Sequence, residues 1–253
     1  MKTTDLIHYL DTYLEINKIP DASLNGLQIE GKEEVNKIGV AVDACYDAMA
    51  AAVAAGVDLL IVHHGLFWDK PVRLVGSEFR RVQALIKNSV NLYVAHLPLD
   101  WHPEVGNNAV LARKIGFEVA EGFGASGAAD GRCIGCIAEA QEGLASAEFI
   151  ERVVTALNGD VRADFFGPAT IKRIAIVTGG GAFLLPQVLR ANVDAFITGE
   201  PKHSLFHFTK ENKLNVIYGG HYETETFGVI ALAEHLRQKF QLPFEFFDFP
   251  TGL

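Results

Sequence analysis

The sequence predicts an α/β protein built from two similar α/β lobes. Short apolar segments of strand length alternate with segments of helical periodicity, which is typical of βαβ units around a largely parallel sheet. The two ends of the chain also repeat each other. Segment 38–43 followed by Val57-Asp58 is similar to segment 174–179 followed by Val193-Asp194, at an offset of 136 residues. A chain of 253 residues is long enough for two such lobes.

Each element follows from apolar spacing and from its flanking turn residues. The first helix, for example, carries Leu6, Ile7, Leu10 and Leu14 on one stripe. Helices are expected at 4–16, 46–55, 78–87, 108–115, 147–157, 183–190, 203–211 and 223–239. Strands are expected at 38–42, 59–62, 92–95, 132–138, 161–165, 174–178, 195–198, 216–218 and 244–249.

The Gly/Ala-rich segment 121–130 is expected to be a loop or a seam between domains. We therefore place the first lobe at 1–125, with C-terminal elements that can return to it, and the second at 126–253. No flexible linker is expected between them. If the lobes are an internal duplication, they face each other across a cleft lined by loops that follow the strands, where open α/β sheets bind ligands.

Composition and charge exclude several classes of function. The chain has 22 basic and 31 acidic residues, a net charge of −9, which disfavours nucleic-acid binding. Three cysteines form no disulfide framework, and Cys133-x-x-Cys136 lies on an expected strand, which favours a structural role. No apolar segment approaches the length of a membrane span. We expect a cytoplasmic protein that does not bind membranes.

Polar side chains gather where three of the expected strands end. His63-His64 follows strand 59–62, Asp100 follows strand 92–95 together with His96 and His102, and His221 and Glu225 follow strand 216–218. Residues four apart share one face of a helix, so the last pair can act together. Each motif also has a purely structural interpretation. The histidines can be core residues whose ring nitrogens are hydrogen bonded, Asp100 can belong to a polar turn, and the acidic residues near His221 can stabilise a helix N-terminus.

Imidazole and carboxylate side chains suit zinc, iron, manganese and nickel. Three histidines and two carboxylates suffice for two ions if one carboxylate bridges them. Other features stay open. The run of glycines at 179–181 favours a tight turn over a phosphate loop, and Glu200, Lys202 and His203 are either groups near the site or a solvated helix start.

Four segments stand out in order along the chain: Val57-Asp-Leu-Leu-Ile-Val-His-His-Gly65, Ala95-His-x-Pro-Leu-Asp100, Asp194-Ala-Phe-Ile-Thr-Gly-Glu200 and Gly220-His-Tyr-x-Thr-Glu225. With the opening stretch Asn25-Gly-Leu-Gln28, they resemble the GTP cyclohydrolase 1 type 2 homologue family, also called Nif-three-like proteins, in its compact form without an inserted domain. The resemblance covers nearly the whole chain.

The resemblance implies a dinuclear metal centre and a ring-shaped homohexamer. It assigns the metal ligands to His63, His64, Asp100, His221 and Glu225, with Glu225 bridging two divalent ions. It also places His96 close to the metals.

Our leading hypothesis is a metal-dependent hydrolase whose metal-bound hydroxide attacks a nucleotide-like or other small substrate, such as the guanine ring of GTP. His96 or His203 would then move the proton. The competing hypothesis is a non-catalytic metal-binding protein that stores or delivers metal or acts as a metal-dependent adaptor. A third, a ring that associates with nucleic acid, is disfavoured by the acidic charge.

Overall fold

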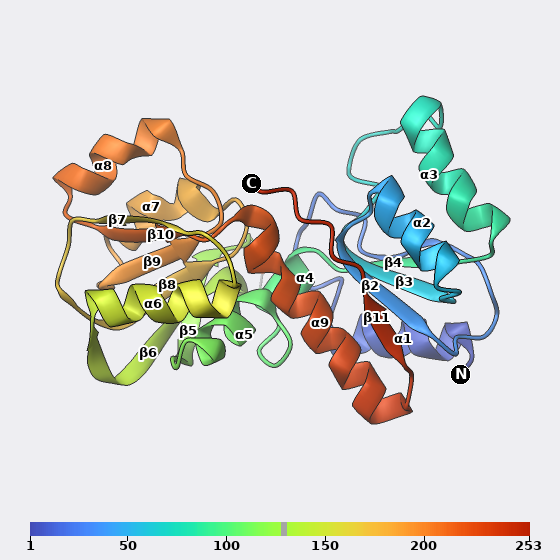
Figure 1. The fold of residues 1–253 in the computed structure, drawn as a ribbon, viewed down its shortest axis with the longest axis horizontal. Coiled ribbons are helices and arrows are strands. Elements are labelled where there is room, and N and C mark those ends of the chain that lie inside the picture. Colours follow the sequence, from blue (N-terminus) through green and yellow to red (C-terminus); the bar gives the residue numbers. More distant parts are fainter. Residues whose placement is uncertain (128–130) are drawn as a thin grey trace. The chain divides into compact units, whose positions relative to one another are not determined.

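The computed structural model describes residues 1–127 and 131–253, and the chain divides into two units (Figure 1). The first comprises Met1–Val105 and Gly228–Phe249, and the second Gly106–Phe227 and Pro250–Leu253. The long helix α9 (His221–Phe240) begins in the second unit and ends in the first. No helix among the described residues is long and apolar enough to span a bilayer.

The first unit is a five-stranded sheet with helices on both faces. In the order β1-β4-β3-β2-β11, all neighbouring strands are parallel except β1, which runs antiparallel to β4. Helices α2 and α3 pack on one face around Met49 and Leu85, and α1 lies on the other, where the Tyr93 hydroxyl donates to Asp11 at 2.9 Å (Figure 1). The elements are α1 (Thr3–Tyr13), β1 (Gly26–Ile29), β2 (Ile38–Asp43), α2 (Tyr46–Ala54), β3 (Leu59–His64), α3 (Gly76–Lys87), β4 (Asn91–Val94), α4 (Leu97–Trp101) and β11 (Phe244–Phe246).

The second unit is a six-stranded mixed sheet in the order β5-β6-β8-β9-β10-β7. Strands β8, β9 and β10 are parallel, whereas β5, β6 and β7 pair antiparallel with their neighbours. Helices α5 and α6 cover one face, where Phe149, Val153 and Leu157 of α6 are buried at a spacing of four, and α7 and α8 cover the other. The elements are α5 (Asn107–Lys114), β5 (Glu118–Ala125), β6 (Cys133–Ala145), α6 (Ser146–Leu157), β7 (Arg162–Phe165), β8 (Thr170–Val177), η1 (Gly181–Leu184), α7 (Leu185–Val188), β9 (Ala195–Thr198), η2 (His203–Leu205), α8 (Phe206–Glu211) and β10 (Asn215–Tyr218).

An aspartate fixes the start of the parallel strands in the same way in both units. Asp58 Oδ2 accepts the backbone N–H groups of residues 36 and 37 at 2.8 and 3.1 Å. Asp194, 136 positions later, accepts those of residues 172 and 173 at 2.8 and 2.9 Å. Each aspartate thereby ties the start of its own strand, β3 or β9, to the residues that enter the neighbouring strand, β2 or β8.

A buried asparagine repeats as well. Asn91 Nδ2 donates to the carbonyls of Lys32 and Asp58, both at 3.0 Å, and its Oδ1 accepts the Gly31 N–H. Asn215 makes the same contacts with Pro168, Asp194 and Gly167, which are the corresponding residues at the offset of 136. The prediction of two similar α/β lobes is confirmed, and the shared hydrogen bonds support an internal duplication.

The structure corrects the prediction for segment 121–130. Residues 118–125 form β5, which pairs antiparallel with β6 and buries Phe123, so pairing overrides the low strand propensity of Gly and Ala. Residues 128–130 of the predicted loop lie outside the described residues. Because β5 joins the sheet of the second unit, the boundary lies after residue 105 rather than after 125, and residues 228–249 return to the first unit.

Other differences are local. The sequence analysis missed β1 and the short helix α4, and the second sheet is mixed rather than largely parallel. Strand β3 extends through His63 and His64, so the histidine pair is the end of the strand and does not follow it. The helix expected at 183–190 is the short pair η1 and α7.

The repeated asparagine can be tested with substitutions that keep its shape. Asn91→Asp and Asn215→Asp each place a carboxylate oxygen against two carbonyl oxygens in a site that is at most 2% exposed. We expect each to lower the free energy of unfolding of its unit by about 2–4 kcal/mol, measured by urea denaturation. The exposed Asn17→Asp is the control. If either buried variant unfolds at the midpoint of the control, the network does not stabilise that unit.

Candidate metal ligands

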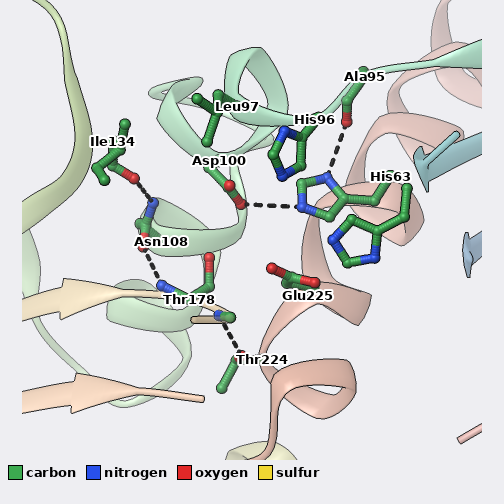
Figure 2. Close-up of polar contacts among 12 residues, drawn as sticks. His63, Ala95, His96, Leu97, Asp100, Asn108, Ile134, Thr178, Thr224 and Glu225 are labelled. Atoms are coloured by element: carbon green, nitrogen blue, oxygen red, sulfur yellow. Dashed lines mark hydrogen bonds and ion pairs between the residues drawn. The ribbon is translucent and has the colours of Figure 1, made fainter. Parts of the chain in front are cut away.

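The first unit brings together four of the predicted site residues at the carboxyl ends of β3 and β4. The imidazole centroids of His63 and His64 are 4.7 Å apart, and that of His96, at the start of α4, lies 5.1 Å from His63 and 5.5 Å from His64. Asp100 of α4 is 6% exposed, and its Oδ1 lies 3.6 Å from His63 Nε2 (Figure 2). One nitrogen from each of the three histidines falls within a 4.8 Å group of possible ligand atoms.

All three histidines use Nδ1 to hydrogen bond an oxygen that can only accept. His63 Nδ1 donates to the carbonyl of Ala95 at 2.9 Å (Figure 2). His64 Nδ1 donates to Asp43 Oδ1 at 2.9 Å, and His96 Nδ1 lies 2.8 and 3.0 Å from the two oxygens of Asp21. With hydrogen on Nδ1, the lone pair sits on Nε2, as in histidines that ligate metals.

The partner of His96 is itself fixed in place. Burial raises the pKa of Asp21, but hydrogen bonds from His96, from Asn25 and from the Ser23 backbone outweigh it and lower that pKa to about 2. Asn25 Oδ1 also accepts the His96 backbone N–H at 2.8 Å. Gln28 accepts the N–H groups of Leu66 and Phe67, so the Asn25-Gly-Leu-Gln28 stretch positions both His96 and the loop after the histidine pair.

The second unit contributes a histidine–glutamate pair at the start of α9. His221 Nε2 lies 3.2 Å from Glu225 Oε2, one turn along the helix, and Glu225 is 3% exposed. His221 Nδ1 hydrogen bonds Glu200, which follows β9. The hydrogen bond with Glu225 raises the pKa of His221 to about 9, against the opposing effect of burial and with further help from Glu200. A cation between Nε2 and the carboxylate, a proton or a metal ion, is therefore strongly favoured.

Glycine makes room for this pair. Gly179 follows β8 with a φ of +62°, and a Cβ there would lie 2.1 Å from Glu225 Oε1 and 3.0 Å from His221 Nε2. Its N–H donates to Thr224 Oγ1 at 3.0 Å (Figure 2), and its carbonyl accepts the Gly181 N–H. The glycine run is thus a tight turn, which was the favoured prediction, and its first residue is required by close approach to the carboxylate.

Two histidines named in the sequence analysis lie in other environments. His102 has both ring nitrogens bonded to backbone, Nε2 to the Tyr13 carbonyl and Nδ1 to the N–H groups of Glu104 and Val105, so its role is structural. His203 is exposed in η2 and lines a separate cavity with Arg162, Lys202 and Tyr218.

The sequence analysis missed the two aspartates that hold histidines. Asp43 carries a detectable signal, because it ends a buried strand next to the one that carries His64. Asp21 lies in a loop and has no such signal. Glu200, for which the sequence analysis left two roles open, is the hydrogen-bond partner of His221.

The described residues therefore include groups of histidine, aspartate and glutamate that could bind metal, as the sequence predicts. The possible ligand atoms are Nε2 of oriented imidazoles in the first unit, and an imidazole with a buried carboxylate in the second. Whether His63, His64, Asp100, His221 and Glu225 act as ligands stays a prediction.

The chain matches the family model described as Duf34/NIF3 (NGG1p interacting factor 3) over residues 1–251. An Archaeoglobus fulgidus protein named GTP cyclohydrolase 1 type 2 homolog is 43% identical over 253 residues, covering 100% of both chains. A Deinococcus radiodurans protein of the same name is 41% identical over 250 residues, covering 98% of this chain and 94% of the relative. The crystal structure of TTHA1606 from Thermus thermophilus is similar with a TM-score of 0.92 and 46% identity, covering 100% of both chains. The resemblance found in the four motifs is confirmed, and the chain belongs to the Duf34/NIF3 family.

Proposed function

We propose that this chain is a metal-dependent hydrolase that uses two divalent ions per chain to act on a small, nucleotide-like substrate. His63, His64 and Asp100 from the first unit and His221 and Glu225 from the second would be the ligands, with Glu225 bridging. The observation that carries the proposal is the common orientation of the imidazoles: four histidines present Nε2 because an oxygen acceptor holds each Nδ1. Oriented imidazoles and buried carboxylates are typical of metal sites whose ligands are set in advance.

When bound, such ions would supply Lewis acidity and increase the acidity of a water molecule. The chain's own groups would do the rest. His96 Nε2 would accept the proton of the attacking water, and Asp21 would hold the imidazole in place by Nδ1. We assign proton transfer to His96 rather than to His203, because His96 lies with the histidines of β3 whereas His203 lines another cavity.

The relatives' name supports a nucleotide as the substrate class and GTP as the first compound to assay. A name does not establish a reaction, so the substrate is part of the proposal. The homohexamer also stays a prediction, and the molar mass in solution by light scattering will decide it. A mass of one chain, 27.6 kDa, would contradict it.

Metal binding can be tested with two glutamates in the same helical turn. Glu225→Gln should remove most of the metal that purifies with the protein, measured by elemental analysis, because a bridging carboxylate serves both ions. Glu223→Gln, two residues away in α9, should leave the content unchanged and is the matched control. Full metal in Glu225→Gln would rule out the bridge.

The same binding should depend on pH. Because the pKa of His221 is raised to about 9, the ring holds a proton below that pH that a metal ion must displace. The apparent affinity should therefore rise with pH, by up to about tenfold per unit, and level off near pH 9. A pH-independent affinity between pH 6 and 8 would exclude His221 as a ligand.

The catalytic part is tested by turnover of GTP and then of nucleotide and phosphodiester panels. We expect activity that disappears on chelation, returns with added metal and falls at least about tenfold in Asp100→Asn even where metal remains. Asp69→Asn, exposed in the loop after β3, should retain activity. If fully metallated protein turns over none of these compounds, the chain is a non-catalytic metal-binding protein.

A further inference from the structure

A second polar cavity lies in the second unit, apart from the candidate ligands. Its volume is about 440 Å³, within the usual range for small-ligand pockets. Its lining includes two permanent cations and a histidine against one carboxylate, in a chain whose net charge is −9. The lining residues used below are Arg162, Asp164, Lys202, His203, Phe206 and Tyr218.

The sheet topology places this cavity where α/β proteins bind ligands. Strands β9 and β10 are parallel, so they end at the same edge of the sheet. Tyr218 is the last residue of β10, and the segment after β9 leads through Glu200 to Lys202 and η2. Strand β7 runs antiparallel to β10 with Arg162 opposite Tyr218, which brings the guanidinium to the same edge.

The arginine is held in a defined orientation. Its guanidinium lies 5.7 Å from the ring centroids of both Phe206 and Tyr218. Asp164 accepts two hydrogen bonds from it, from Nε at 3.2 Å and from Nη2 at 2.9 Å. This fork uses only part of the N–H donors of the guanidinium, so the group can still bind an anion.

Lys202 supplies the second positive charge, and His203 adds an imidazole. The Lys202 ammonium lies 5.9 Å from the Phe183 ring centroid, and Lys202 and His203 are both exposed. Asp164 already occupies one carboxylate-binding face of Arg162. A doubly charged phosphate, with three acceptor oxygens, matches the two cations and the imidazole better than a second carboxylate does.

We propose that this cavity binds the phosphate group of a small phosphorylated molecule. The claim that this molecule is the substrate rests on the proposed hydrolase function. Two of the three chain segments that line the cavity continue into the candidate ligands of this unit. Glu200, two residues before Lys202, hydrogen bonds His221, and His221 itself follows Tyr218 by three residues. A ligand held here by its phosphate would have its other end directed along the strand ends toward His221.

Binding is tested on the full chain stripped of metal by chelation, so that its result is independent of catalysis. Calorimetric titration should show saturable binding of inorganic phosphate and of GMP, and none of guanosine. If GMP binds more tightly than phosphate, the ligand of the cavity is a phosphorylated molecule. If the two bind with equal affinity, the cavity is a site for free phosphate only, and the proposal is overturned. Lys202→Gln and Arg162→Gln should each weaken GMP binding by about tenfold or more.

Lys210→Gln, which removes an exposed charge from α8 outside the cavity lining, is the matched control and should bind GMP as the wild type does. No saturable phosphate or GMP binding, or equal binding by wild type and by Lys202→Gln, would overturn the proposal. If a metal-dependent turnover exists, Lys202→Gln should raise KM about tenfold with kcat and metal content unchanged. Failure of all turnover would contradict the proposed function and leave the titrations to decide the cavity.

Discussion

The parallel strands of this protein depend on buried hydrogen bonds at their amino ends. In each unit an aspartate ties the entry of one strand to that of its neighbour, and an asparagine ties the third strand to both through two carbonyls and one N–H. Asp58, Asn91 and Asn215 are at most 6% exposed, so their hydrogen bonds form away from competing water. Because strand entry and register are fixed there, the opposite ends of the strands, which carry the polar residues, are fixed as well.

At those opposite ends, hydrogen bonds from Nδ1 decide what the histidines can do. A ring that donates from Nδ1 leaves Nε2 for another partner, and His63, His64, His96 and His221 all do so. In His221 that partner is the Glu225 carboxylate. His102 shows the alternative, since backbone groups engage both of its nitrogens. The same residue type is thus a candidate ligand or a structural group according to which atoms of the chain surround it.

The second unit combines two kinds of polar site at one sheet edge. The carboxylates of Glu225 and Glu200 both contact the His221 imidazole, and their negative charge favours a bound cation. The cavity around Arg162 and Lys202 has the opposite charge and favours an anion. Gly179 keeps the space next to the Glu225 carboxylate open, because any side chain at this position would occupy it. A substrate that is bound by its phosphate and altered by metal chemistry requires both kinds of site.

The sequence by itself determined the fold class, the repeat at an offset of 136 residues and the family. These depend on apolar periodicity and on short motifs, which are local properties of the chain. It also identified the helix that begins near His221 and the glycine turn after β8. Only the tertiary structure decided that residues 118–125 pair as a strand and that residues 228–249 return to the first unit, because both follow from contacts with segments distant in sequence. The same reason explains why Asp21 was missed as the partner of His96, and why His102 is separated from the candidate ligands. Hydrogen-bond partners 75 or 89 residues away have no signature in local spacing.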